Sequence, residues 1–164
     1  MDKRQLVEQL SEQLRSTAKV AAEAKESAAH EARFGATPAE KRMDARVALE
    51  YANLAQAQGR RERRALGELE VLARFSPGRF SEQAPIAAGA IVEVEDEESG
   101  QGRTFFLAPV GAGITLTGPG GDGQLSVVTP ASPIGRAVLG RRVGDVIEVT
   151  VKDETREWTI TYVG

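Results

Sequence analysis

The spacing of hydrophobic residues along this chain changes near residue 76. Before that point apolar side chains recur every three or four residues, which is the period of one face of an α-helix. After it they alternate in short runs between glycine-rich turns, as they do in β-strands. The pattern predicts an α+β protein with a helical hairpin over residues 1–76, a linker over 77–84 and a small β-rich domain over 85–164.

The first predicted helix has one apolar stripe, which runs through Leu6, Leu10 and Leu14 and continues in small side chains as far as Ala28. A break at 34–37 follows, and the second helix comes directly after it. A connection this short forces the two helices to be antiparallel, so residues whose numbers sum to about 71 or 72 should face each other. We therefore expect an antiparallel coiled coil with its turn at 34–37.

The second predicted helix begins at Thr37, because Thr37 can cap it, Pro38 suits its first position and Glu40 completes a capping box. Its apolar stripe has helical spacing and contains Met43, Val47, Tyr51, Leu54, Ala65, Leu69 and Leu72. We expect this stripe to be buried against the first helix.

Alternating apolar residues in the second half predict six strands, at 90–95, 104–108, 114–117, 125–129, 145–151 and 157–163. A short helix is expected at 132–139, because Ser132 can cap it, Pro133 suits its first position and Gly140 can end it. Ile134, Val138 and Leu139 should face the sheet. The glycine run at 118–123 is interpreted as a hairpin turn, since neither a Lys-Ser/Thr pair nor a helix follows it.

Composition narrows the possible functions. The chain has no cysteine, which excludes disulfides and thiolate metal sites, and its formal net charge of -3 argues against a general polyanion binder. No hydrophobic run suits a membrane span or a signal peptide, so a cytoplasmic protein without membrane contact is expected. One dense basic cluster stands out: Arg60, Arg61, Arg63 and Arg64. It is either a solvated face paired with Glu62 and Glu68 or a patch that contacts phosphates.

Residues 132–149 closely resemble a known sequence, the signature helix and following strand of the Gre family (GreA/GreB) of bacterial transcription factors. The layout is also similar, with a coiled-coil hairpin followed by a small FKBP-like, β-rich domain with one helix. The clear resemblance covers about residues 85–164. It implies that the domain docks on the β′ rim of the secondary channel of RNA polymerase through its signature helix, which contains Ser132, Pro133, Ile134, Gly135 and Arg136.

Cleavage factors of this family carry an acidic tip, in which an Asp and a Glu hold the second Mg²⁺ that drives hydrolysis of backtracked RNA. Counting back without gaps from the end of the hairpin places Asp44, Glu50 and Tyr51 at matching positions, but Val47 stands in place of the metal-binding Glu. Valine offers no oxygen ligand to a hard cation. The resemblance therefore implies a non-cleaving member with no cofactor of its own.

The alternative to a non-cleaving protein is a cleavage factor with an altered coil tip. The early helix start puts Phe34 and Gly35 at the tip and Asp44 on the shaft. Glu40 and Asp44 are four residues apart and share a helix face, and Glu31 lies near them across the turn, so they are candidate ligands for a Mg²⁺ ion shared with the polymerase. Carboxylates in a first turn more commonly interact with the helix dipole.

Four functions remain open. The resemblance implies, first, a monomeric regulator that inserts its coil into the secondary channel, where basic residues of the coil approach RNA polymerase or the 3′ end of the nascent RNA. The second is a cleavage-stimulating factor, in which the polymerase remains the enzyme. The third is a prolyl isomerase, which would need an aromatic pocket from Phe105, Phe106, Trp158 and Tyr162. The fourth is a coiled-coil interaction protein unrelated to polymerase.

Overall fold

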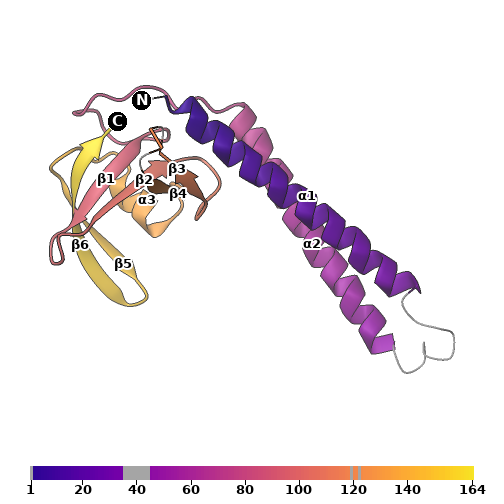
Figure 1. Cartoon of the computed structure of the whole chain (residues 1–164). Coiled ribbons are helices and arrows are strands. Elements are labelled where there is room, and N and C mark those ends of the chain that lie inside the picture. The colour runs from indigo at the N-terminus through magenta and orange to yellow at the C-terminus, as the bar shows by residue number, and fades with distance from the viewer. Residues whose placement is uncertain (1, 35–44, 119, 122) are drawn as a thin grey trace. The chain divides into compact units, whose positions relative to one another are not determined.

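The structure, a computed structural model, describes residues 2–34, 45–118, 120–121 and 123–164 (Figure 1). Within these ranges two long helices, α1 (Arg4–Phe34) and α2 (Ala45–Ala73), precede a six-stranded sheet with one short helix, which confirms the predicted α+β class. None of the described helices has the length and apolar character that a membrane span needs. The chain divides into two compact units, the hairpin unit (Ser11–Glu70) and the sheet unit (Met1–Leu10 with Val71–Gly164), so the predicted linker at 77–84 lies inside the sheet unit.

The two helices of the hairpin unit are antiparallel, as predicted (Figure 1). The apolar stripe of α1 is confirmed, since its members in this unit are buried or partly buried. The fully buried ones are Leu14, Ala18, Ala21 and Ala28. Most of these residues are alanines, so the buried face of α1 in this unit is made mainly of small side chains.

The predicted stripe of α2 is wrong between residues 47 and 54. Val47, Tyr51 and Leu54 are 44%, 37% and 46% exposed. The partly buried residues come one position later, at Ala48, Ala52 and Ala55, and the buried Gly59 continues them. The prediction followed side-chain size, whereas the less exposed side of α2 carries alanines and a glycine. A one-residue offset turns the buried face by about 100°.

The pairing register of the hairpin also differs from the prediction. Lys25 Nζ lies 2.8 Å from Glu62 Oε1 across the two helices, so these facing residue numbers sum to 87. The predicted sum of about 71 or 72 assumed a four-residue turn at 34–37. The predicted helix start at Thr37 and Pro38 lies outside the described residues.

All six predicted strands are present, with ends shifted by three residues or fewer. The sheet order is β3-β4-β2-β1-β6-β5, and every pair is antiparallel except β2 with β4. The strands are β1 (Ile91–Asp96), β2 (Gly102–Leu107), β3 (Thr115–Thr117), β4 (Gln124–Val128), β5 (Val146–Val151) and β6 (Glu154–Val163). Lys152 and Asp153, both with positive φ, join β5 to β6 in the two-residue hairpin that suits the twist of the strands.

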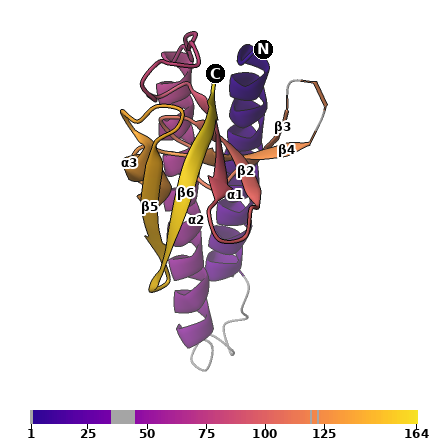
Figure 2. The ribbon, with the colours of Figure 1, turned by 90° about the vertical axis from the view of Figure 1, so that its left-hand side faces the viewer.

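Helix α3 (Pro133–Val138) packs against β5 (Figure 2). Its Val138 belongs to the core between helix and sheet, together with Phe105, Ile147 and Ile160, and Ile134 packs on the edge of this core. The expectation for Leu139 was wrong, because this residue is 47% exposed. Leu139 is the C-cap, with φ -56° and ψ 126°, so its side chain leaves the buried face of the helix.

Within the sheet unit, residues 2–10 contribute three side chains that are bonded or buried there. Lys3 Nζ donates hydrogen bonds to the backbone oxygens of Gly89 and Gly164, at 2.9 and 3.2 Å. The amide of Gln9 donates to Thr117 O and accepts from Thr117 N, which satisfies backbone groups of the edge strand β3. Leu10 is fully buried. These contacts explain why residues 2–10 belong to the sheet unit rather than to the hairpin.

Candidate functional site

The predicted coil tip is described only in part. Glu31 and Phe34, in the last turn of α1, are exposed, and Phe34 is 69% exposed with its ring 5.1 Å from that of His30. Gly35, Glu40 and Asp44 lie outside the described residues, so the proposed grouping of Glu31 with the other two carboxylates stays a prediction. In the part of the chain that the structure describes, no three His, Cys, Asp or Glu side chains are grouped so that they could hold a metal.

The first turns of α2 carry little that could bind a cation. Val47 has no ligand atom and lies on the exposed side of the helix. Glu50, three residues later, is paired with Arg46, with Nε 3.4 Å from Oε1. Both of these side chains are largely exposed, so the pair contributes little stability, but it places a positive charge beside the carboxylate.

The basic cluster on α2 is a solvent-exposed face in which one arginine is paired. Arg64 Nε lies 3.2 Å from Glu68 Oε1, as the solvated-face interpretation predicts. Glu62 was expected to pair with the cluster but pairs with Lys25 of α1 instead. Within the described residues, Arg60, Arg61 and Arg63 make no ion pair. Three guanidinium groups are therefore available to a partner.

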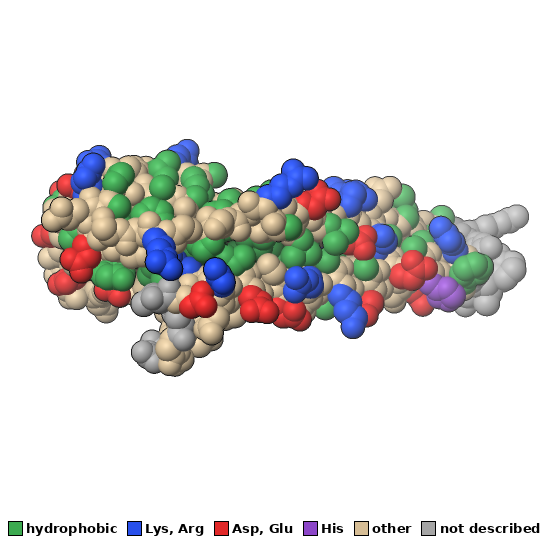
Figure 3. All heavy atoms as spheres, turned by 90° about the horizontal axis from the view of Figure 1, so that it is seen from above, with side chains coloured by type: hydrophobic (Ala, Val, Ile, Leu, Met, Phe, Trp, Pro, Cys, Tyr) green, Lys and Arg blue, Asp and Glu red, His purple; other side chains and the backbone are tan. Residues whose placement is uncertain are grey.

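Two of these arginines border a hollow on the hairpin. It has a volume of about 400 Å³, and Lys25, Gly59, Arg60 and Arg63 are among its lining residues. A β-carbon at Gly59 would lie 3.3 Å from Lys25 Cδ, so the missing side chain leaves room for the lysine stem. On the face shown in Figure 3, basic and acidic side chains are interspersed along the helices, so the cluster is a local feature.

The signature helix α3 owes its form to Ser132 and Gly135. Ser132 Oγ accepts a hydrogen bond from Gly135 N at 3.0 Å and donates one to Thr129 O at 2.8 Å, which confirms the predicted cap. Gly135 is buried against the backbone of Thr129, and Gly140 ends the helix with φ 77°, as expected.

The five predicted docking residues therefore differ in what they can do. Three of them have structural roles: Ser132 caps the helix, Ile134 packs against the core, and Gly135 lies in close contact with the backbone of Thr129. Pro133 and Arg136 are exposed. A partner that binds the solvent-exposed face of α3 can contact these two side chains.

The space beneath α3 is too small for a prolyl-isomerase pocket. An apolar hollow there is lined by Val94, Ile134, Ile147 and Trp158 among others, and its volume is about 10 Å³. That is no more than about one water-sized probe sphere. Two of the aromatic residues that such a pocket would need, Phe105 and Phe106, are completely buried. The geometry gives no support to the isomerase alternative.

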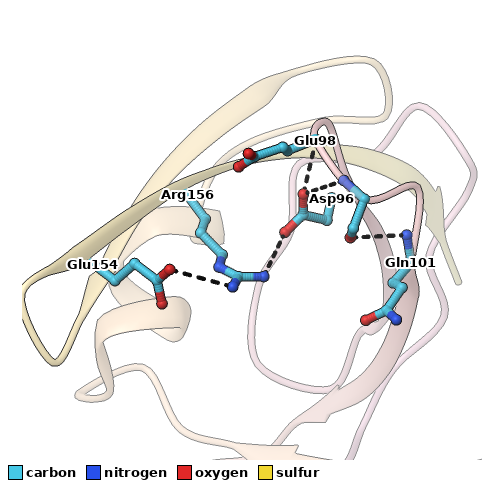
Figure 4. A network of polar contacts seen from close by, with 6 residues as sticks. Asp96, Glu98, Gln101, Glu154 and Arg156 are labelled. Atoms are coloured by element: carbon cyan, nitrogen blue, oxygen red, sulfur yellow. Dashed lines mark hydrogen bonds and ion pairs between the residues drawn. The ribbon is translucent and has the colours of Figure 1, made fainter.

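Sequence reasoning missed a polar network at the end of β1 (Figure 4). The buried carboxylate of Asp96 accepts hydrogen bonds from Ser99 N and Glu98 N, at 3.0 and 2.8 Å, and from Arg156 at 3.2 Å. The Ser99 bond is the largest cause that holds the pKa of Asp96 below its usual value, and bonding to Asp96 raises the pKa of Arg156. The network fixes the β1–β2 turn; an Asp before Ser99-Gly100 is a signal that could have revealed it.

Lys3 was missed as well. Its side chain is buried, with Nζ 4.6 Å from the centre of the Phe80 ring, and burial lowers the pKa of its ammonium group. Its hydrogen-bond acceptors lie 86 and 161 residues away in the sequence, so no local pattern indicates them.

The match to a family model lies in the sheet unit. The family model "Transcription elongation factor, GreA/GreB, C-term" matches residues 81–164. Transcription elongation factor GreA of Verminephrobacter eiseniae is 31% identical over 97 residues, which are 59% of this chain and 56% of that protein. GreA of Mycolicibacterium smegmatis is 33% identical over 98 residues, 58% of this chain and 56% of that protein. The chain thus matches little more than half the length of these relatives.

One similar solved structure is that of GreA factor homolog 1 (Gfh1) of Thermus thermophilus. It is 25% identical, with 96% of this chain and 94% of that chain covered and a TM-score of 0.41. A GreA/GreB transcription elongation factor from Nitrosomonas europaea is 20% identical, with 60% of this chain and 78% of that chain covered and a TM-score of 0.37.

Proposed function

Because the chain belongs to the GreA/GreB family of transcription elongation factors, we propose that it binds RNA polymerase at the secondary channel, inserts its helical hairpin and does not stimulate RNA cleavage. In this role the protein is a regulator and not itself an enzyme. It acts in the cytoplasm as a monomer, and its two units have separate tasks: the sheet unit docks and the hairpin unit reaches inward.

Docking is assigned to the solvent side of α3. Pro133 and Arg136 are the exposed members of the signature helix, and Leu139 follows them on the surface. Arginine is enriched in protein interfaces, and a partner can bury the two apolar side chains beside it. The capped helix is short and is held by Gly135, so a partner meets these residues in one fixed arrangement.

The lack of cleavage stimulation rests on one observation, the valine at position 47. At 44% exposure this position is open to solvent, so a carboxylate there would be accessible to a metal ion, and valine supplies none. The neighbouring carboxylate of Glu50 lies beside Arg46, whose positive charge opposes a second cation.

Arg60, Arg61 and Arg63 are proposed to contact the polymerase or the nascent RNA. Their guanidinium groups are exposed and have no acidic partner within the described residues. Guanidinium groups pair with phosphate oxygens in a two-pronged geometry, which suits an RNA backbone near the hairpin.

Cleavage stimulation is the alternative, and one observation favours it. Glu31 is exposed in the last turn of α1, and within the described residues it has no ion-pair partner. It could share a Mg²⁺ ion with Glu40 and Asp44 and with the polymerase active site.

An assay with a stalled, backtracked polymerase distinguishes the non-cleaving function from cleavage stimulation. The complex carries RNA labelled at its 5′ end and is incubated with Mg²⁺ and the full chain, and RNA length and elongation rate are measured. We expect unchanged RNA length and an altered rate. Shortened RNA would favour the alternative, and a known cleavage factor in a parallel reaction verifies that the complex can be cleaved.

A further inference from the structure

A second hollow lies within the sheet unit, where the start of α1 meets the segment that follows α2. Its volume is about 740 Å³, and Lys3, Arg4, Val7, Phe75, Ser76 and Arg79 are among the residues that line it. Small-molecule sites usually measure about 300–1,000 Å³. The hollow is therefore large enough for a ligand, and it is separate from the coil tip and from α3.

The charges around the hollow favour an anion. Arg4 and Arg79 line it from two different segments, and within the described residues neither makes an ion pair. Asp2 is the acidic residue of the lining, and its carboxylate already accepts a hydrogen bond from Arg4 N at 3.0 Å. Lys3 Nζ is also occupied, by two backbone oxygens. Two guanidinium groups thus remain for a ligand.

Both walls of the hollow contact one residue, Gly89, the first through a hydrogen bond and the second through close backbone packing. Lys3 of the first wall donates to Gly89 O at 2.9 Å. Pro77 of the second wall lies so close that a β-carbon at Gly89 would be 2.0 Å from Pro77 O, and Gly89 has φ 101°. The two segments are therefore held in place before any ligand arrives, which lowers the entropic cost of binding.

The remaining lining indicates the kind of ligand. Phe75 offers a half-buried aromatic ring, Val7 and Pro77 add apolar surface, and Ser76 has a hydroxyl group. A phosphate group alone would leave most of this volume and the aromatic surface unused. Guanidinium pairs bind phosphate oxygens, and aromatic rings stack on nucleobases. We propose that this hollow binds a nucleoside di- or triphosphate, with Arg4 and Arg79 on the phosphates and Phe75 against the base.

Calorimetric titration of the full chain tests the site in the absence of polymerase, so its failure would leave the proposed function untouched. The probes are ATP, GTP, inorganic pyrophosphate and adenosine. We expect saturable binding of at least one nucleotide, weaker binding of pyrophosphate and no binding of adenosine. No saturation with either nucleotide at millimolar concentration would overturn the proposal. Pyrophosphate binding as tight as nucleotide binding would exclude the contact with the base and would also overturn it.

Three variants locate the site. Arg4→Gln and Arg79→Gln should each weaken nucleotide binding about tenfold, because each removes a charge-assisted pair of hydrogen bonds. Arg141→Gln is the control and should bind as the wild type does, because Arg141 is exposed in the same unit and does not line the hollow. Equal weakening in all three would indicate unspecific attraction and would contradict the site. Thermal unfolding of each variant verifies that its fold is intact.

Phe75→Leu tests the aromatic contact separately. The substitution keeps the wall apolar, so pyrophosphate binding should be unchanged while nucleotide binding weakens. Unchanged nucleotide binding in this variant would show that the base lies elsewhere, against the proposal.

Discussion

A β-carbon at Gly135 would lie 1.8 Å from the backbone oxygen of Thr129. No real contact is that short, so any side chain at position 135 must push α3 away from the segment before it. Gly135→Ala should therefore lower the free energy of unfolding by about 2–4 kcal/mol, through strain at a position that cannot relax. Urea unfolding of the variant and the wild type at neutral pH measures this difference in the free energy of unfolding.

The matched control for that substitution is Gly67→Ala on α2, where a β-carbon would meet nothing within 4 Å. Alanine is the better helix former by about 1 kcal/mol, so this variant should be more stable than the wild type. Equal effects of the two substitutions would contradict the close contact at Gly135.

Gly59→Ala should stabilise the hairpin less than Gly67→Ala does. Both exchanges gain about the same helix propensity, roughly 1 kcal/mol. At Gly59, however, the new methyl group would lie 3.3 Å from Lys25 Cδ, so the lysine stem, whose Nζ is paired with Glu62, must shift by a few tenths of an ångström. Urea unfolding of the two variants, side by side, gives the difference. If the two gains are equal, the lysine adjusts without cost.

The Asp96 network should make stability depend on acid pH. The pKa of Asp96 is lowered in the folded protein, chiefly by the hydrogen bond from Ser99 N. Its contribution is therefore fully present above the unfolded pKa of about 4 and is lost as the pH falls through the folded pKa below that. Asp96→Asn should be less stable than the wild type at pH 7, and the difference should shrink as the pH falls below 4.

Urea unfolding from neutral pH down to strongly acid pH gives this comparison. Glu98→Gln is the control, because only the backbone N–H of Glu98 bonds to Asp96. A gap between Asp96→Asn and the wild type that stays constant with pH would mean that the carboxylate charge does not stabilise the turn.

Val47→Glu should introduce some Mg²⁺-dependent RNA cleavage in the backtracked polymerase assay. The position is exposed, so the fold should tolerate the change within about 0.5 kcal/mol, and glutamate supplies the missing oxygen ligand. Val47→Gln, similar in shape but neutral, should stay inactive. Full-length RNA with both variants would mean that residue 47 does not reach the metal.

Arg136→Glu should weaken binding to RNA polymerase about tenfold or more, because it reverses a charge on the proposed docking face. Arg74→Glu is the control in the same unit, since Arg74 is exposed and lies outside α3. Fluorescence anisotropy of the labelled full chain against polymerase measures both. Equal affinity of the two variants for polymerase would contradict docking through α3.

The sheet unit could be predicted closely from sequence because its signals are local. Ser132, Gly135 and Gly140 act on backbone atoms within a few residues, and strand alternation repeats every second position. The hairpin unit was harder to predict from the sequence. Its helices were evident from the sequence. The less exposed side of α2, however, consists of alanines and a glycine, while Val47, Tyr51 and Leu54 are exposed. Apolar size marks a buried face only where the facing helix leaves room for it.

The candidate sites show the same division. The basic cluster and the exposed members of α3 were recognisable from composition and from family resemblance. Lys3 and the hollow beside it were not, because their partners come from residues 75–89 and Gly164, far away in the sequence. Such sites exist only once the chain has folded.

The place of β1 in the sheet has a consequence for how the protein is made. β1 pairs with β2 on one side and with β6 on the other, and Val163 of β6 is fully buried in the core. On the ribosome, α1 and α2 can pair early, since both are synthesised before β1. The sheet cannot close until residues 154–163 have been synthesised, and until then the inner faces of β1 and β2 are exposed to other chains. The sheet unit is therefore the part that most needs protection from aggregation during translation.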